Sequence, residues 1–175
     1  MERAKSKQED MYRVGYSQFV PCTVEEVEKI EICIGHCLPE AYREFLLWMG
    51  HSGGGFLRGS NCFYRDLRNL QESAQELLDE DQFPGKLPKD AFVFFMHQGY
   101  QFNFFCLDEG DDPPVLCYLE EEPVKTSFFQ IYPRFSDFVI TEIEGHIKIK
   151  DTIKASEMRR MQNELNRKRD INNRE

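Results

Sequence analysis

The stretch FVFFMHQGYQFNFFCL, residues 92–107, decides the fold of this chain. Two aromatic and apolar runs, 92–96 and 102–107, flank the short segment 97–100, which contains a glycine. Aromatic residues favour strands, and two such runs joined by a short link are typical of an antiparallel hairpin. The later runs 114–119 and 128–132 indicate a third and a fourth strand. The sequence therefore predicts an antiparallel sheet in the middle of the chain.

Two helical patterns precede this predicted sheet. Thr23 and Glu26 have the spacing of a capping box, which opens a helix that ends at Gly35. A second helix follows Pro39, a residue suited to a first helical turn, and ends at Gly50. Their apolar stripes are Val24, Val27, Ile30 and Ile34 in the first helix, and Tyr42, Phe45, Leu46 and Met49 in the second.

A third helix is predicted from Asp66 onward, with an acidic outer face, and a closing helix from Ser136. The fold class is therefore α+β: a twisted antiparallel sheet flanked by N-terminal helices and a closing C-terminal helix. We divide the chain into a polar N-terminal arm (1–19), one domain (20–150), and a charged tail (151–175) that is either helical or disordered. The outer face of the third helix carries Glu72, Glu76, Asp79, Glu80 and Asp81.

The net charge of −9 is unevenly spread along the chain. Residues 148–175 hold nine Lys or Arg and five Asp or Glu, a charge of +4, which leaves −13 on residues 1–147. Such an acidic body repels phosphates, so it disfavours direct nucleic-acid binding and favours a basic protein partner.

No stretch approaches the roughly 18–20 apolar residues that span a bilayer. The charged start MERAKSKQED lacks an apolar run of the signal-peptide type. We therefore expect a cytoplasmic protein whose six cysteines are buried, reduced thiols.

Carboxylates gather at both ends of the predicted third strand, with no Lys or Arg among them. Opposite a basic cleft, such as that of a nuclease, they would speed encounter and occupy the phosphate-binding surface. A solvated acidic loop that maintains solubility explains the same pattern. The candidate partner-binding residues are Asp108, Glu109, Asp111, Asp112, Glu120, Glu121 and Glu122.

Aromatic side chains alternate along the predicted strands, at Tyr100, Phe102, Phe104 and Tyr118. One face of the sheet must be core, and the other would expose aromatics suited to anchoring a partner. Burial in the core alone explains most of them.

Metal, anion and nucleophile sites have weak sequence support. In the acidic segment 108–112, Gly110 comes too early for a calcium loop of the EF-hand type. Cys33 and Cys37 with His36 could bind zinc, but they lack a second matched pair. The triple glycine 53–55 lacks the Lys-Ser/Thr ending of a phosphate-binding loop, and the four histidines are not spaced like a catalytic pair. We therefore predict no enzyme activity, no metal and no cofactor.

The stretch TVEEVEKIEICIGHCLPEAYREFLLWMGHSGG, residues 23–54, resembles the N-terminal signature of the SUKH superfamily, also called the SMI/KNR-like family. Residues 92–121 are similar to that family's hairpin, and YPRFSDFV, residues 132–139, resembles the start of its closing helix. The turn after the second helix departs from the family pattern, because it lacks the usual Asn before Gly. The residues that carry the signature are Leu38, Pro39, Tyr42, Phe45, Gly50 and Gly53.

The resemblance implies a helix-flanked, twisted antiparallel sheet with no known active site. Bacterial members are similar to immunity proteins that neutralise secreted toxins, often nucleases, and fungal members look like regulatory adaptors in cell-wall signalling. Our leading hypothesis is an immunity protein that binds a basic, nuclease-type toxin. A regulatory scaffold that docks through the charged tail is the alternative, and a small-ligand-binding protein or hydrolase is a second one. The sequence leaves the partner and the oligomeric state open.

Overall fold

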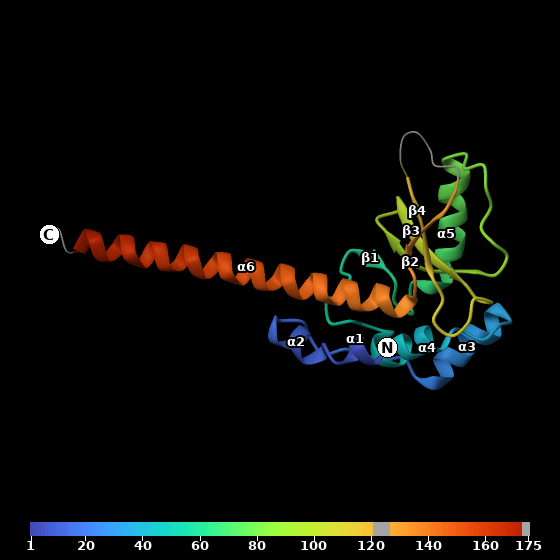
Figure 1. Cartoon of the computed structure of the whole chain (residues 1–175), viewed down its shortest axis with the longest axis horizontal. Coiled ribbons are helices and arrows are strands. Elements are labelled where there is room, and N and C mark those ends of the chain that lie inside the picture. Colours follow the sequence, from blue (N-terminus) through green and yellow to red (C-terminus); the bar gives the residue numbers. More distant parts are fainter. Residues whose placement is uncertain (121–126, 173–175) are drawn as a thin grey trace.

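The computed structural model describes residues 1–120 and 127–172, and its centre is an antiparallel sheet (Figure 1). The strands pair in sequence order, β1-β2-β3-β4-β5. Their bounds are Ser60–Asn61 for β1, Ala91–His97 for β2, Gln101–Cys106 for β3, Val115–Leu119 for β4 and Phe129–Tyr132 for β5. The predicted hairpin and the two strands after it are confirmed, and β1 adds a short edge.

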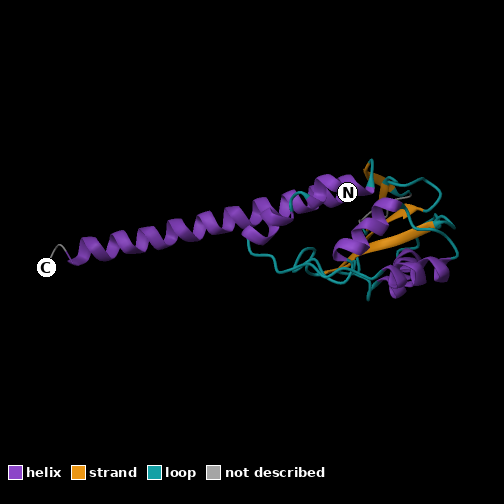
Figure 2. Cartoon of the chain, turned by 90° about the horizontal axis from the view of Figure 1, so that it is seen from below, coloured by secondary structure: helices purple, strands orange, loops and turns teal. Residues whose placement is uncertain are grey.

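Helices cover both faces of this sheet. One face packs on α5 (Leu67–Glu80), and the other packs on α4 (Glu40–Met49) and the first part of α6 (Phe135–Asn172). The remaining helices are α1 (Glu2–Lys5), α2 (Gln8–Arg13) and α3 (Val24–Ile34). Figure 2 shows the helices and strands from a second direction. The α+β prediction, with N-terminal helices and a C-terminal helix, is confirmed.

An irregularity in β2 explains how so many aromatic residues are buried on one face. The register of β2 against β3 shifts between Val93 and Phe95, so Phe94 is an extra residue in the ladder. A β-bulge of this kind breaks the alternation of side chains between the two faces. Phe94 and Phe95 therefore both belong to the core under α4 and α6, whereas Val93 and Met96 on either side pack toward α5.

The alternating aromatics do not form an exposed anchor. Phe102, Phe104 and Tyr118 are buried between the sheet and α5, and only Tyr100, in the hairpin turn, is 37% exposed. The anchoring alternative is therefore wrong for three of the four residues. The physical reason is that α5 covers the second face of the sheet, so both faces are core.

The polar start of the chain is also more structured than the sequence indicates. We expected a polar arm over residues 1–19, but α1 and α2 pack against α6, and Ala4, Met11, Val14 and Tyr16 are buried. The Lys5 ammonium contacts the Glu44 carboxylate at 2.6 Å, and Arg13 pairs with Asp151 at 3.0 Å. These helices are too short for a hydrophobic period to be visible in the sequence.

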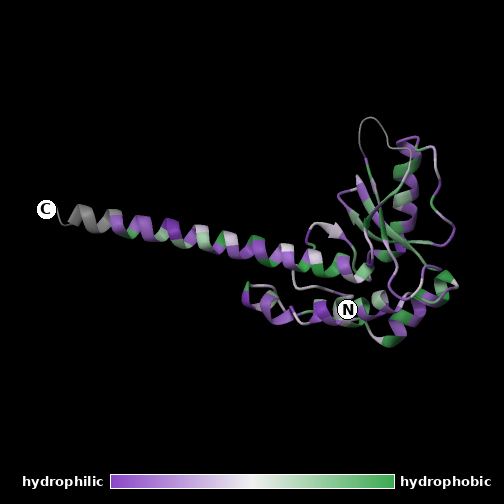
Figure 3. Ribbon diagram, in the orientation of Figure 1, coloured by the Kyte–Doolittle hydropathy of each residue, from purple (hydrophilic) through white to green (hydrophobic). Residues whose placement is uncertain are grey.

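Helix α6 begins in the core and ends far from it. Phe135, Phe138, Val139 and Ile143 are buried, but Ile149 and Ile153 are exposed. The tail continues the same helix as far as Asn172 and projects away from the body, with mostly hydrophilic residues along it (Figures 1 and 3).

Tyr42 is the centre of the larger core. It is fully buried, and its ring lies 5.2–5.3 Å from the rings of Phe92, Phe105 and Phe135. Burial raises the pKa of its hydroxyl, and this hydroxyl has no hydrogen-bond partner among the described residues. A buried polar group without a partner lowers stability, because it loses its hydration without compensation.

We expect Tyr42→Phe to leave the free energy of unfolding unchanged or to raise it by about 1 kcal/mol, because the ring contacts stay and the unpaired hydroxyl goes. Tyr42→Ala should lower it by roughly 3–5 kcal/mol through loss of the ring. Urea denaturation of both variants measures the difference. A loss above about 1 kcal/mol in Tyr42→Phe would show that the hydroxyl has a partner.

His146 should make the stability of the fold depend on pH. Its Nδ1 atom lies 2.6 Å from the Tyr16 hydroxyl, and its ring packs on Phe56 at 5.0 Å. Burial, and then the charge of Lys150, lower the pKa of His146 from 6.5. As the pH falls, the unfolded chain therefore takes up a proton at a higher pH than the folded chain does. The contribution of neutral His146 to the free energy of unfolding is complete above pH 6.5, and it is lost as the pH falls from there through the pKa of the folded state.

Wild type should accordingly lose more stability than His146→Gln when the pH is lowered from about 7.5 to about 5. Parallel thermal unfolding of the two proteins across this range measures the effect. Identical pH profiles would contradict a buried, neutral His146.

Candidate functional site

The candidate acids lie in two separate groups, one at each end of β4. Asp108, Glu109, Asp111 and Asp112 precede the strand, and Glu120 follows it. Five extended residues separate the groups by roughly 15 Å or more. Glu121 and Glu122 lie outside the described residues.

In the first group, Asp108 is paired with a histidine that sequence spacing does not bring near it. The Asp108 carboxylate lies 2.9 Å from Nε2 of His36, and Nδ1 of His36 lies 2.8 Å from the Cys37 carbonyl. The bond to Cys37 and then the bond to Asp108 raise the pKa of His36. Protonation of His36 would offset part of the negative charge at this end of the strand.

Asp112 has a structural role at the start of α6. Its carboxylate accepts hydrogen bonds from the Ser136 N–H at 2.8 Å and from the Ser136 hydroxyl at 2.5 Å, at the start of α6. Asp111 contributes its backbone, because its carbonyl accepts the Ala41 N–H near the start of α4. The Asp112 carboxylate therefore caps the start of α6, a structural role that the sequence pattern did not indicate.

We expect Asp112→Ala to lower the free energy of unfolding by about 1–2 kcal/mol, as loss of a helix cap does. Asp111→Ala should change it by less than about 0.5 kcal/mol, since the side chain is exposed and the backbone carbonyl remains. Chemical denaturation of the two neighbouring variants provides a matched comparison. Equal losses would contradict the assignment.

The second group is larger than the strand pattern indicated, because the end of α5 joins it. The Tyr118 hydroxyl donates to the Asp81 carboxylate at 2.5 Å, and burial, that bond, and the charges of Asp81 and Glu120 all raise the pKa of Tyr118. The exposed acids of the last turns of α5 continue the same surface. We call this surface the acidic end; it comprises Glu76, Asp79, Glu80, Asp81 and Glu120.

The acidic end is electrostatically unfavourable for the isolated domain. The C-terminus of a helix carries partial negative charge, and α5 has no basic residue in its last turn to complement it. Sequence analysis noted the acidic face of this helix but could not place it beside Glu120. The sequence feature that indicated this surface was the run Asp79-Glu80-Asp81, which ends the helix with no Lys or Arg.

The signature residues of the sequence resemblance have structural roles. Leu38, Tyr42 and Phe45 are buried in the core, and Pro39 precedes α4. Gly50 is required by close packing, since a Cβ atom there would lie 2.4 Å from the Cys22 sulfur. In the glycine turn that includes Gly53, Gly54 has a φ of +64° and packs against the Ser17 backbone. The Gly54 N–H is bonded to the Ser52 hydroxyl, so it does not point to an anion.

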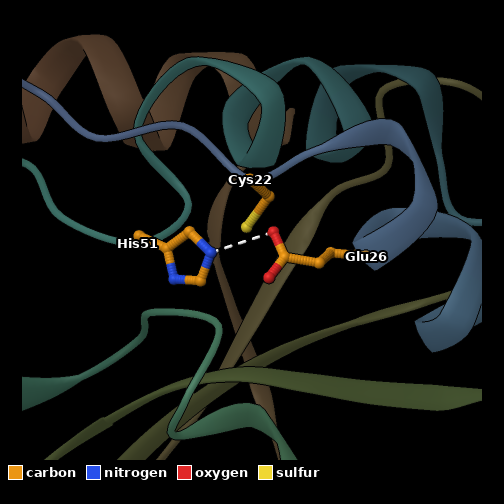
Figure 4. A group of neighbouring side chains, drawn as sticks. All are labelled: Cys22, Glu26 and His51. Atoms are coloured by element: carbon orange, nitrogen blue, oxygen red, sulfur yellow. Dashed lines mark hydrogen bonds and ion pairs between the residues drawn. The ribbon is translucent and has the colours of Figure 1, made fainter.

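One cluster that sequence analysis missed joins the start of α3 to the end of α4 (Figure 4). Cys22, Glu26 and His51 place their ligand atoms within 4.8 Å of one another, and Nε2 of His51 lies 2.9 Å from Glu26. Burial, and then the charge of Glu26, raise the pKa of the Cys22 thiol to about 12. The thiol is therefore protonated at neutral pH, and His51 is bonded to Glu26 and not to the sulfur.

This cluster links the start of α3 to the end of α4 by hydrogen bonds. The Glu26 carboxylate also accepts the Thr23 N–H at 2.9 Å and completes the predicted capping box. A soft cation there would have to displace the thiol proton and compete with that cap. The zinc set considered from the sequence does not assemble: Cys33 and Cys37 are exposed, and the His36 ring nitrogens contact Cys37 and Asp108. Exposure of these two cysteines also corrects the expectation that the thiols are buried.

A polar cavity of about 460 Å³ lies between the sheet and α6. His97, Tyr132, Glu142 and His146 are among its lining residues. Burial raises the pKa of Glu142, which accepts a hydrogen bond from the Tyr132 hydroxyl at 3.4 Å. The cavity could hold a small polar molecule, and one hydroxyl–imidazole pair lines it, with Ser60 Oγ 2.8 Å from Nδ1 of His97.

Comparison with known proteins gives the family. The SMI1 / KNR4 family (SUKH-1) matches residues 21–141, and the chain belongs to this family. The match includes the signature on α3 and α4, strands β1 to β5 and the start of α6, as the sequence resemblance implied. A search of the curated proteins found no match. Among the described residues, no helix is both long enough and apolar enough to cross a membrane.

Proposed function

We propose that this chain is a non-catalytic, cytoplasmic protein-binding domain that recognises a basic surface of its partner through the acidic end. The observation that supports this proposal is the concentration of carboxylates at the C-terminus of α5, where they oppose the helix dipole. These carboxylates belong to Glu76, Asp79, Glu80, Asp81 and Glu120. A basic partner would relieve this repulsion, so binding would recover free energy that the isolated domain lacks. Membership of the SMI1 / KNR4 family supports a role of the immunity or regulatory kind.

Within that range we favour neutralisation of a toxin, of the nuclease type, because a nuclease presents a basic cleft to phosphates. The acidic end would cover such a cleft, and the charge of −13 on residues 1–147 would accelerate encounter. The alternative, a regulatory adaptor, is favoured by one observation: α6 continues beyond the body as an exposed helix that could dock elsewhere.

Neutralising the acidic end should slow association with the physiological partner. The partner is first captured from lysate of the native cells at low salt, and its release at high salt is verified. We expect a variant with Glu76→Gln, Asp79→Asn, Glu80→Gln and Glu120→Gln to bind it with an association rate about tenfold lower and with weaker salt dependence. Surface plasmon resonance measures both rates.

A matched control removes the same number of charges elsewhere. Glu9, Glu28, Glu157 and Glu164 are exposed, so their replacement by Gln changes the net charge equally without touching the acidic end. Equal slowing in both variants would show that the effect comes from general net charge and not from the acidic end.

Truncation after Ala155 separates the immunity role from the adaptor role, and it preserves the contacts of Arg13 with Asp151 and Lys154. An immunity protein should retain its partner after this truncation, whereas an adaptor that docks through α6 should lose it.

A further inference from the structure

The described residues enclose a groove of about 1080 Å³ far along α5 from the acidic end. It lies between α3, the first turns of α5, and the start of β2. Its apolar lining includes Ile30, Ile32, Ile34, Leu67, Phe92 and Leu107. The groove is separate from the polar cavity under α6 and from the Cys22 cluster.

The apolar stripe of α3 is largely unused by the fold. Of its four members only Val27 is buried, whereas Ile34 is 37% exposed. Ile32, which also belongs to α3 but not to this stripe, is 77% exposed. Burial of apolar side chains is favourable, so this helix carries apolar surface whose burial would stabilise a complex. Contiguous exposed apolar residues of this kind mark interaction sites.

Four cations border this apolar surface, although the chain as a whole is acidic. Lys29, Arg65, Arg68 and Lys89 line the groove, and no Asp or Glu is among its described lining residues. The one ion pair of Arg65 with a described residue is with its neighbour Asp66, at 3.4 Å. Lys29, Arg68 and Lys89 have no ion pair with another described residue.

The placement of Arg68 is unfavourable for the free domain in the same way as the acidic end. Arg68 lies in the first turn of α5, which holds no acidic residue, and a helix N-terminus favours negative charge. At the C-terminal end of α5 the charge is of the sign that the helix dipole disfavours, and at the N-terminal end Arg68 adds such a charge beside the N-cap acid Asp66. At the N-terminal end, a bound carboxylate would satisfy the cations and the dipole together.

We propose that this groove binds an acidic, amphipathic segment of a partner protein. The apolar side chains of that segment would pack on Ile32 and Ile34, and its carboxylates would pair with Arg68 and Lys89. Recognition of an amphipathic peptide by an apolar groove with charged rims is a general mode of protein interaction. A nucleic acid would leave the apolar floor of the groove uncovered.

The first experiment identifies the chemistry of the occupant without assuming its sequence. A displayed library of random peptides is selected against the full chain, and the enriched peptides are sequenced. We expect enrichment of Asp or Glu together with Leu, Ile or Phe at spacings of three and four residues. Enrichment of basic or purely polar peptides, or of none, would overturn the proposal.

The second experiment locates the binding site with the most enriched peptide, labelled with fluorescein. The double variant Arg68→Glu, Lys89→Glu should weaken binding at least tenfold, and Ile32→Ser should weaken it several-fold. Both variants should fold normally, because the residues are exposed and Arg68→Glu places an acid where the helix dipole favours one. Thermal unfolding of each variant checks this expectation.

The matched control reverses two exposed cations on α6, with Lys148→Glu and Arg159→Glu. This variant has the same net charge as the groove variant and should keep wild-type affinity for the peptide. Equal weakening in both variants, or unchanged binding in the groove variant, would overturn the proposal. So would competition of the peptide by phosphatidylserine vesicles, or a dimer by light scattering that the groove variant dissociates, since these outcomes assign the groove to a membrane or to a second copy.

Discussion

The packing of Tyr42 against the phenylalanines of the sheet is the interaction on which the rest of this structure depends. Its ring contacts Phe92 and Phe105 in two neighbouring strands and Phe135 at the start of α6. One side chain of α4 therefore sets the distance between the helical layer, the sheet and the closing helix. Because aromatic rings bury large areas and prefer edge-to-face contacts, this cluster specifies relative orientation as well as stability. The bulge at Phe94 belongs to the same arrangement, since it turns one more ring toward Tyr42.

The layered core also determines which surfaces remain for partners. With α5 over one face of the sheet and α4 and α6 over the other, most of the described sheet is covered, and the two candidate binding surfaces lie at the ends of α5. Helix α5 carries carboxylates at its C-terminus, contrary to its dipole, and Arg68 in its first turn beside the N-cap acid Asp66. Such a charge arrangement lowers the stability of the free domain slightly. It is therefore better explained by complex formation than by folding, and it supports one acidic and one basic binding surface on the same helix.

The polar clusters of the chain mostly serve the fold. Asp112 fixes the start of α6, Glu26 and His51 fix the start of α3, and Glu31 accepts the Leu38 N–H ahead of α4. Each of these groups satisfies backbone or side-chain donors at a helix terminus, where unpaired groups are expensive to bury. The buried Cys22 thiol, with its raised pKa, likewise fits packing better than nucleophilic chemistry.

The sequence alone determined the α+β class, the capping box of α3, the helices α4 and α5, and the aromatic hairpin, because these depend on local spacing of apolar residues and on caps. It also carried the resemblance that the family match confirmed. Only the tertiary structure decided the roles of residues distant in sequence. No local pattern encodes how the layers pack. That packing brings Asp112 to Ser136, Asp81 to Tyr118, and α3 to the start of α5. The burial of residues 1–19 was likewise decided by contacts with α4 and α6, since two helices of four and six residues are too short to show a period of their own.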